Sequence, residues 1–318
     1  MQARGALAAV LSSALGGTAI GATRFLTMAL DPVAMGVLRF GGGFIILAAI
    51  VAAARRTWPV RRDWPPIAAL GVLFFCVFPL LFNAALIHTT AARGALALST
   101  LPLLAVVIGA ILGRERPTVQ KTLGVLVAIL GVATALGLGY ADAPQGAWRG
   151  DLLMVAAAFC MALYSVLSRP FISQNGPLPF TTLGMGAGAT CLCAMSLIFR
   201  PLPSMAALEP VQWAAVAYLA IVGGAIIFLL WAFALAHTTA TVVTVSVAVN
   251  PVTATIYGHV LLGEPAGPNV AVGVVAVLCG VGLTYLGAVR ERSGAARPRW
   301  REKHDDGPVL EGRTPRAE

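Results

Sequence analysis

Charged side chains are scarce in this 318-residue sequence, at 11 % of residues, against roughly 25 % in a typical soluble domain. Hydrophobic residues make up 58 %. A soluble chain of this length alternates apolar and polar faces, whereas here one long apolar run follows another almost without pause. The scarcity of charge excludes an ordinary soluble domain and predicts an all-α, polytopic membrane protein.

Several chemical signatures are also absent. The five cysteines form no CxxC pair and all lie in apolar runs, so we expect neither a disulfide framework nor a zinc site. The phosphate-binding pattern GxxxxGK(S/T) does not occur, which argues against ATP as a direct energy source. The sequence has no HExxH and no GxSxG, and its Asp and Glu residues lie at run ends, in loops or in the tail. We therefore expect no enzyme, no metal and no cofactor.

Apolar runs of about 20 residues, the length that crosses a bilayer, dominate what is present. The first run follows Arg4 and could imitate a secretory signal, but nine more follow it, which favours a retained span. We interpret the runs as ten transmembrane helices, which we number spans 1 to 10. They lie at about 5–24, 33–54, 66–88, 92–113, 119–139, 150–169, 180–199, 210–236, 240–262 and 269–289.

The formal net charge of +9 reflects orientation in a membrane. Lys and Arg collect in alternate loops, after spans 2 and 4 and after residue 289, and this positive-inside bias predicts that both termini are cytoplasmic. The chain would then lie in the inner membrane of a cell, in contact with lipid and without a nucleic-acid partner. The segment 290–318 has no apolar period, and we expect a disordered cytoplasmic tail.

The stretch HTTA occurs at 88–91 and again at 237–240. With an offset of 149 residues the two regions align without a gap, and His88 meets His237 while Pro102 meets Pro251. Earlier in each half the offset is 145, so that Arg24 meets Arg169. The sequence therefore predicts two homologous halves, 1–145 and 146–289.

Each half contains five spans, and an odd number makes the second half enter the membrane from the opposite side. Loop charge agrees, because the loop RRTWPVRRDWPP corresponds to RPLPSMAALEP, which keeps only Arg200. The sequence thus predicts two inverted five-helix repeats. Inverted repeats with interrupted helices are typical of secondary transporters, whose substrate sites lie near the midplane between the halves.

The sequence resembles the EamA-type proteins of the drug/metabolite transporter superfamily. The resemblance rests on LRF at 38–40 and on the ordered patterns ALIHTTA…LPLL…LGRE and ALAHTTA…NPVT…LGE. It implies ten helices around a central cavity lined mainly by spans 1, 3, 4, 6, 8 and 9, and export of amino acids, other metabolites or drugs. The family often has Trp in span 1 and a counterpart of that Trp in span 6. This sequence departs from the family at both positions, with Gly16 in span 1 and Met161 in span 6.

Two prolines and a few polar or aromatic side chains are the candidates for the cavity. Pro102 and Pro251 each remove a helical N–H and free a carbonyl, that of Leu98 or Val247, which needs a polar partner in lipid. The amide of Asn250 could serve a zwitterion or hold helices together. The candidates for the substrate cavity are Asn83, Thr100, Pro102, Tyr164, Trp231, Ser246, Asn250, Pro251 and Tyr257.

The candidates for coupling or gating are Arg39, His88, His237 and His259. An Arg inside a span is a functional hypothesis by default, but span 2 is not central to the implied cavity, and we favour a structural pairing of Arg39 with Asp31. His88 and His237 end their spans on opposite faces, so they cannot share a metal and are expected to cap their helices. His259 can titrate near neutral pH, which makes it the candidate for proton coupling, with packing as the alternative.

The leading hypothesis is a secondary exporter of a small metabolite, such as an amino acid or a related neutral or zwitterionic solute, by alternating access. No carboxylate stands in mid-membrane to hold a cation, which disfavours cation exchange. Its partners would be the solute, the bilayer and, as a candidate coupling ion, the proton. The alternatives are a drug exporter or a metabolite importer of the same fold, or a non-transporting membrane scaffold or sensor.

Overall fold

The computed structural model describes residues 2–114, 144–199 and 208–264, with isolated positions at 119–131 and 268–283. The expected spans 5 and 10 and the tail 290–318 lie outside the three continuous segments. Within the described residues, eight helical segments are long and apolar enough to cross a membrane, and they match the other eight expected spans to within a few residues. These segments are Arg4–Leu26, Pro32–Ala53, Arg61–His88, Ala91–Ile111, Ala147–Leu167, Pro177–Ile198, Pro210–His237 and Ala240–Leu262.

Every regular element in these segments is helical, and several spans consist of more than one helix. In chain order the elements are α1 (Gln2–Leu26), α2 (Pro32–Gly36), η1 (Val37–Gly41), α3 (Gly42–Ala53), η2 (Arg61–Asp63), α4 (Trp64–Val72), η3 (Leu73–Val77), α5 (Phe78–His88), α6 (Ala91–Leu98), α7 (Leu101–Ile111), α9 (Ala147–Leu167), α10 (Arg169–Asn175), α11 (Pro177–Phe199), α12 (Pro210–Tyr218), η5 (Leu219–Ile226), α13 (Ile227–His237), α14 (Ala240–Val245), η6 (Ser246–Val249) and α15 (Asn250–Leu262).

The repeated HTTA stretch is a helix-to-helix connection. His88 and His237 are the last residues of α5 and α13. Each is followed by a Thr in extended conformation, which stops the helix, and by a second Thr that caps the next one. The Thr90 hydroxyl accepts from the N–H of Arg93, and the Thr239 hydroxyl from the N–H of Val242, both at 3.3 Å. The repeat is thus explained by capping chemistry.

In the described spans three stretches are π-helical, and the sequence did not predict them. The stretch η1 lies in span 2, while η3 and η5 lie in spans 3 and 8, at overlapping positions of the 149-residue alignment. Such widened turns locally rearrange the helical hydrogen bonds and often occur at functional sites. The stretches in spans 3 and 8 immediately precede α5 and α13, which contribute side chains to the cavity described below.

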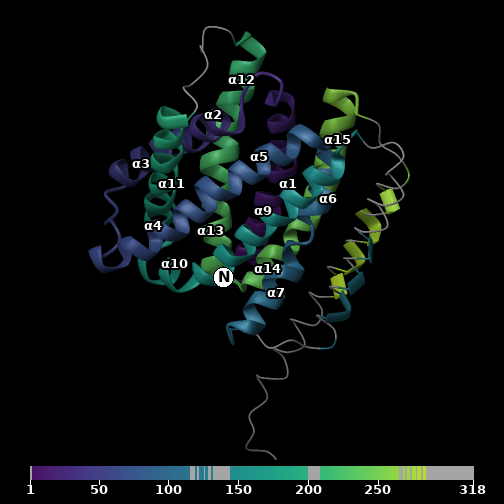
Figure 1. The fold of residues 1–318 in the computed structure, drawn as a ribbon. Coiled ribbons are helices and arrows are strands. Elements are labelled where there is room, and N and C mark those ends of the chain that lie inside the picture. The colour runs from purple at the N-terminus through teal and green to yellow at the C-terminus, as the bar shows by residue number, and fades with distance from the viewer. Residues whose placement is uncertain are drawn as a thin grey trace, which may run out of the picture.

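The first helix of each half packs against the third and fourth spans of the other half. Thus α1 lies against α13 and α15, and α9 lies against α5 and α7. Figure 1 shows α1, α5, α9 and α13 at the centre of the bundle, with α11 beside α3 and α4 on one flank. The short α10, which follows α9, was not predicted. It packs against α11 and α13.

Contacts near the helix termini define two ends of the bundle. At the Arg24 end, Arg24 of α1 donates to the Leu86 carbonyl near the end of α5 at 2.8 Å, and Gly150 at the start of α9 lies against the Ala85 carbonyl. At the Arg169 end, Gly5 at the start of α1 lies against His237. Helices α1 and α9 therefore run in opposite directions.

Candidate functional site

A small cavity lies at the centre, where spans 1, 3, 4, 6, 8 and 9 converge. Its volume is about 40 Å³, enough for a few water molecules, whereas pockets that hold small-molecule ligands have roughly 300–1,000 Å³. In this conformation the cavity is too small for a metabolite. It is lined by Ser12, Ser13, Gly16, Arg39, Phe78, Phe82, Leu98, Met161, Ile227, Phe228, Trp231, Val247 and Asn250.

The interruptions of spans 4 and 9 reach this cavity. Helix α6 ends at Leu98 and α7 begins just before Pro102, while a 3-10 turn, η6, precedes Pro251 in α15. Leu98 and Val247, whose carbonyls the prolines release, both line the cavity. The sequence therefore located the breaks correctly, although Pro102 and Pro251 themselves stand outside the lining.

The lining residues fall into pairs that correspond in the two halves. With the offsets of 145 and 149 residues, Gly16 corresponds to Met161 and Leu98 to Val247. Phe82 corresponds to Trp231, and Phe78, four residues earlier in the same register, to Ile227. Equivalent positions of the two halves thus converge on one space, with different side chains at each.

The polar groups of the cavity have no polar counterparts. Ser13, Arg39 and Asn250 correspond to Ala158, Gly184 and Leu101. The Ser12 hydroxyl donates to the Ile227 carbonyl at 2.9 Å. The two halves therefore line the cavity with equivalent backbone positions but with different side chains. The hydroxyl, amide and guanidinium groups come from spans 1, 2 and 9.

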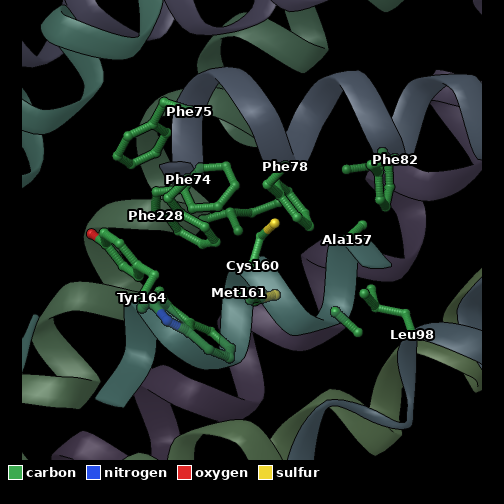
Figure 2. Close-up of a cluster of buried hydrophobic side chains, with 14 of the residues drawn as sticks. Phe74, Phe75, Phe78, Phe82, Leu98, Ala157, Cys160, Met161, Tyr164 and Phe228 are labelled. Carbon is green, nitrogen blue, oxygen red and sulfur yellow. The ribbon is translucent and has the colours of Figure 1, made fainter. Parts of the chain in front are cut away.

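An aromatic cluster forms the apolar side. Figure 2 shows Phe74, Phe78 and Phe82 along one helix, facing Met161 and Tyr164 of α9. The Phe74 and Tyr164 rings stack with their centroids 3.9 Å apart, and the ring centroids of Phe78 and Phe82 are 5.4 Å apart. Such rings supply a rigid, apolar wall. Tyr164, a predicted lining residue, lies buried within this cluster instead of on the cavity surface.

Arg39 is the charged group of the cavity and is 5 % exposed. Its Nε and Nη2 donate to the Gly223 carbonyl at 3.1 and 3.0 Å. The absence of a Cβ at Gly223 leaves room for this approach, since a Cβ there would lie 3.3 Å from Nε. The guanidinium lies 5.8 Å from the Phe228 ring centroid and 5.9 Å from that of Phe82, within cation–π range.

Two expectations about Arg39 were wrong. It does not pair with Asp31, because the Asp31 carboxylate caps α2 by accepting from the N–H groups of Val33 and Ala34 at 2.9 and 3.1 Å. Span 2 was also expected to lie away from the cavity, whereas its η1 turn brings Arg39 into the lining. The carboxylate of an Asp just before a helix accepts hydrogen bonds from the first N–H groups of that helix in preference to a more distant arginine, because those groups are adjacent in the chain.

Trp231 and Asn250, two of the candidates proposed from sequence, line the cavity. Both are buried, and the Trp231 Nε1 donor and the Asn250 Oδ1 acceptor have no hydrogen-bond partner among the described residues. Gly16 lies against the Asn250 amide, where a Cβ would come within 3.2 Å of Oδ1. A small residue at position 16 therefore leaves this amide accessible from α1.

The remaining predicted cavity residues make local or interhelical contacts. Asn83 Nδ2 donates to the Pro32 carbonyl at 3.0 Å, joining α5 to α2. Ser246 and Ser13 hydroxyls are 2.8 Å apart, and Thr100 donates to the Ala97 carbonyl at 2.8 Å. The Tyr257 ring fills the notch at Gly21 of α1. Asn83, Thr100, Tyr164, Ser246 and Tyr257, with the two prolines, do not line the cavity.

The three candidate histidines lie away from the cavity. His237 Nδ1 is 2.8 Å from the Phe233 carbonyl, as expected for a residue in the last turn of a helix. His88 ends α5 and lies beside Gly150. His259 is exposed on α15, with Nδ1 3.2 Å from the Glu264 carbonyl. Its position weakens the proposal that it carries the coupling proton, because a relay must reach the solute site.

Sequence reasoning missed the two serines and the full role of span 2. Ser12 and Ser13 are consecutive hydroxyls in an otherwise apolar run, and that departure was the available signal. Both are buried in α1. For Arg39 the charge itself was the signal, but its direction depends on the π-helical turn that carries it.

A helical membrane protein with paired interrupted spans and a small, partly polar cavity where those spans meet has the design of a solute transporter. Similarity to known proteins supports this class. The profile of the EamA-like transporter family matches the chain twice, over residues 3–137 and 148–286. The chain therefore belongs to the EamA-like transporter family.

Individual relatives agree with the family. The uncharacterized transporter YyaM of Bacillus subtilis (strain 168) is 26 % identical over 264 residues, covering 82 % of this chain and 86 % of that protein. A protein of Streptantibioticus cattleyicolor named "Probable terminal-alkyne amino-acid exporter" is 29 % identical over 245 residues, covering 76 % and 79 %. A crystal structure at 22 % identity has a TM-score of 0.67 and covers 90 % of this chain and 96 % of its own, which shows the shared fold.

These findings confirm the family predicted from sequence and the general role. The protein is a multi-pass membrane transporter of the EamA family, with a small-molecule substrate and a place in a membrane, and not an enzyme. The two matches of the family profile correspond to the two halves of the chain.

Proposed function

We propose that this protein is a secondary transporter that exports a small metabolite, an amino acid or a related neutral or zwitterionic solute, from the cytoplasm across the cell membrane. The cavity lined by repeat-related pairs is the observation that carries this proposal. Because equivalent positions of the two halves meet there, an exchange of conformation between the halves would expose it to either side in turn. The named amino-acid exporter among the relatives supports the substrate class.

The architecture that we propose is a pair of inverted five-helix repeats, 1–145 and 146–289, with both termini cytoplasmic and the tail 290–318 in the cytosol. The opposite directions of α1 and α9 support the inversion. Cysteine labelling tests it in a variant without native cysteines. Val60 and Glu209, which precede the corresponding spans 3 and 8, are both exposed, and cysteines placed there should react with an impermeant maleimide from opposite sides. Labelling from one side would refute the inversion.

Counterflow in proteoliposomes tests transport. Vesicles loaded with unlabelled apolar amino acids should accumulate external labelled L-leucine, L-methionine or L-phenylalanine, and empty liposomes should not. An imposed pH gradient that accelerates export would assign the coupling ion to the proton. A drug exporter would ignore the amino acids and exchange lipophilic compounds, and a scaffold would exchange neither.

Two asparagine variants separate a transport role from a structural one. Asn250→Leu introduces the residue found at the corresponding position 101 and removes an amide that lines the cavity and whose Oδ1 has no partner among the described residues, so transport should fall more than the folded yield. Asn83→Leu is the matched control, because the Asn83 Oδ1 is likewise unpartnered there but the residue lies outside the cavity lining and bonds α2, and its transport should fall in step with yield. Parallel losses in both variants would make Asn250 structural.

A further inference from the structure

The guanidinium of Arg39 carries a charge that the described part of the protein does not balance. Both ion pairs among the described residues, Arg24 with Glu264 and Arg93 with Asp151, involve other arginines. The Arg39 Nη1 is buried and has no hydrogen-bond partner in the described structure. The described residues that line the cavity include no Asp or Glu. A buried cation held by one carbonyl and by ring faces is thus one anion short of neutrality.

Burial makes this imbalance significant. A charge in a low-dielectric interior is stabilised mainly by a counter-ion and by hydrogen bonds to all its donors. The Gly223 carbonyl accepts from Nε and Nη2 and leaves Nη1 unused. A carboxylate is the anion that best matches the fork of a guanidinium, because it accepts two charge-assisted hydrogen bonds in one plane.

We propose that Arg39 binds the carboxylate of the transported solute and so selects an amphipathic amino acid, a zwitterion with an apolar side chain. This inference rests on the proposed function and specifies its substrate class. Arg39 acts as a binding residue, since the carboxylate supplies the charge that the cavity lacks. Neutral solutes and amines would leave the guanidinium unbalanced.

Two further unpartnered groups complete the recognition. The Trp231 Nε1 is a donor available to a second carboxylate oxygen, and the Asn250 Oδ1 is an acceptor available to an ammonium group. Both residues line the cavity together with Arg39. One cation, one neutral donor and one neutral acceptor match an α-amino acid and offer no acidic partner to a solute with net positive charge.

The apolar side chains of the lining account for the side chain of the solute. Phe78, Phe82, Leu98 and Met161 bring apolar side chains to the cavity. Apolar side chains gain by leaving water for such a wall, whereas a second polar group would lose its hydration there without a partner. The one-sided distribution of polar groups therefore favours leucine-like, methionine-like and phenylalanine-like solutes.

Competition in the counterflow assay tests the role of the carboxylate. Unlabelled L-leucine, L-leucinamide and isoamylamine, the amine that lacks the carboxylate, are compared as competitors of labelled L-leucine. In the wild type the amide and the amine should compete at least about ten-fold more weakly, the size expected for one lost charge-assisted hydrogen bond. The same comparison is made with methionine and phenylalanine.

The Arg39→Gln variant should lose this discrimination, so that acid and amide compete alike, and Arg39→Lys should retain part of it because it keeps the charge but not the fork. Arg149→Gln, which changes an arginine on the exposed face of α9, is the matched control and should discriminate as the wild type does. The acid-to-amide ratio is internal to each preparation, and a lower yield of folded variant does not alter it.

The outcomes separate the two proposals. If the wild type exchanges amino acids but binds acid and amide equally, the Arg39 inference is overturned while the proposed function stands. Discrimination that survives in Arg39→Gln would also overturn it, because another group would then hold the carboxylate. Absence of exchange for all three amino acids would overturn the proposed function together with this inference. Should Arg39→Gln fail to fold, the wild-type comparison decides alone.

Discussion

The two ends of the helix bundle share a backbone framework but differ in charge. At the Arg24 end, Arg24 donates to the Leu86 carbonyl at 2.8 Å. At the other end Arg169, its repeat counterpart, donates to the Leu235 carbonyl, the counterpart of Leu86, at 3.4 Å. Duplicated residues thus make the same contact at opposite ends, and the contact is shorter at the Arg24 end.

An additional ion pair distinguishes the Arg24 end. Arg93 Nη2 is 2.6 Å from Asp151 Oδ2, and the pair joins α6 to α9. The Thr89 hydroxyl donates to the other Asp151 oxygen at 3.2 Å. The counterparts of Arg93 and Asp151 are Val242 and Ala6, so the repeat-related ion pair cannot form at the Arg169 end.

The other ion pair between described residues also lies at the Arg24 end, and Glu115, the counterpart of its carboxylate residue, lies outside the described residues. Arg24 Nε is 3.2 Å from Glu264 Oε1, and Glu264 Oε2 accepts from the N–H of Ala91 at 3.0 Å. The Arg169 end contains a hollow of about 290 Å³, lined in part by Arg114 and Arg169, and the Arg24 end contains one of about 570 Å³, lined by residues 27–33 and Ile87. The comparison shows one backbone framework at both ends, with an Arg93–Asp151 pair at one end whose counterpart residues at the other carry no charge.

The largest expected effect comes from breaking the Arg93–Asp151 pair. Asp151→Ala leaves Arg93 without its carboxylate at a site where the two side chains are 7 % and 15 % exposed, so the free energy of unfolding should fall by about 3–5 kcal/mol. The double variant Arg93→Val with Asp151→Ala copies the residues of the Arg169 end and should lose less, because it removes the guanidinium together with its carboxylate. Unfolding with SDS in mixed micelles measures both.

The same double variant should make the two ends more alike in opening. A cysteine at Ser13, in the cavity wall, should react faster with an impermeant thiol reagent added from the Arg24 end. Glu209→Gln, a change at an exposed helix start, is the control for removal of a carboxylate and should leave this rate unchanged. A double variant that is less stable than Asp151→Ala would contradict the account.

Features that depend on neighbours in the chain were predictable from sequence. The spans follow from apolar length alone, and the interruptions of spans 4 and 9 follow from Pro102 and Pro251, because proline removes a helical donor wherever it stands. The repeat was visible because His, Pro and Glu recur at fixed offsets. None of these features requires knowledge of which helices touch.

The candidate site depended on contacts between distant segments, and sequence located it only in part. Trp231 and Asn250, both proposed from sequence, line the cavity, but Arg39 was assigned to Asp31, its nearest acid in the chain. The carbonyl that it binds belongs to Gly223, 184 residues away. Periodicity cannot reveal such a partner. It also cannot place His259, since an interior and an exterior face are equally apolar in a membrane protein.

A smaller effect is expected when glycines in close helix contacts at the two ends are replaced by alanine. An added Cβ would lie 2.7 Å from the Ala85 carbonyl oxygen in Gly150→Ala, whereas in Gly5→Ala the nearest backbone atom outside α1 would be 3.4 Å away, although the His237 Cβ would be at 2.9 Å. Overpacking costs about 1–3 kcal/mol, and alanine regains up to about 1 kcal/mol of helix propensity over glycine.

We therefore expect Gly150→Ala to lower the free energy of unfolding by about 1–2 kcal/mol, after that gain is subtracted, and Gly5→Ala to lower it less. Gly41→Ala, where an added Cβ would meet nothing within 4 Å, is the control without a clash. The same unfolding titration measures all three. Equal losses for Gly150→Ala and Gly5→Ala would show that the tighter contact at the Arg24 end does not affect stability.

The smallest effect concerns what the ends have in common. Thr90 and Thr239 cap α6 and α14 through hydrogen bonds of the same length, 3.3 Å, so Thr90→Ala and Thr239→Ala should each cost about 1 kcal/mol. Serine at either position keeps the hydroxyl and should restore most of the loss. A clearly larger cost at Thr90 would mean that the cap also positions Arg93 for Asp151, and the framework of the two ends would then not be independent of the charges added to one of them.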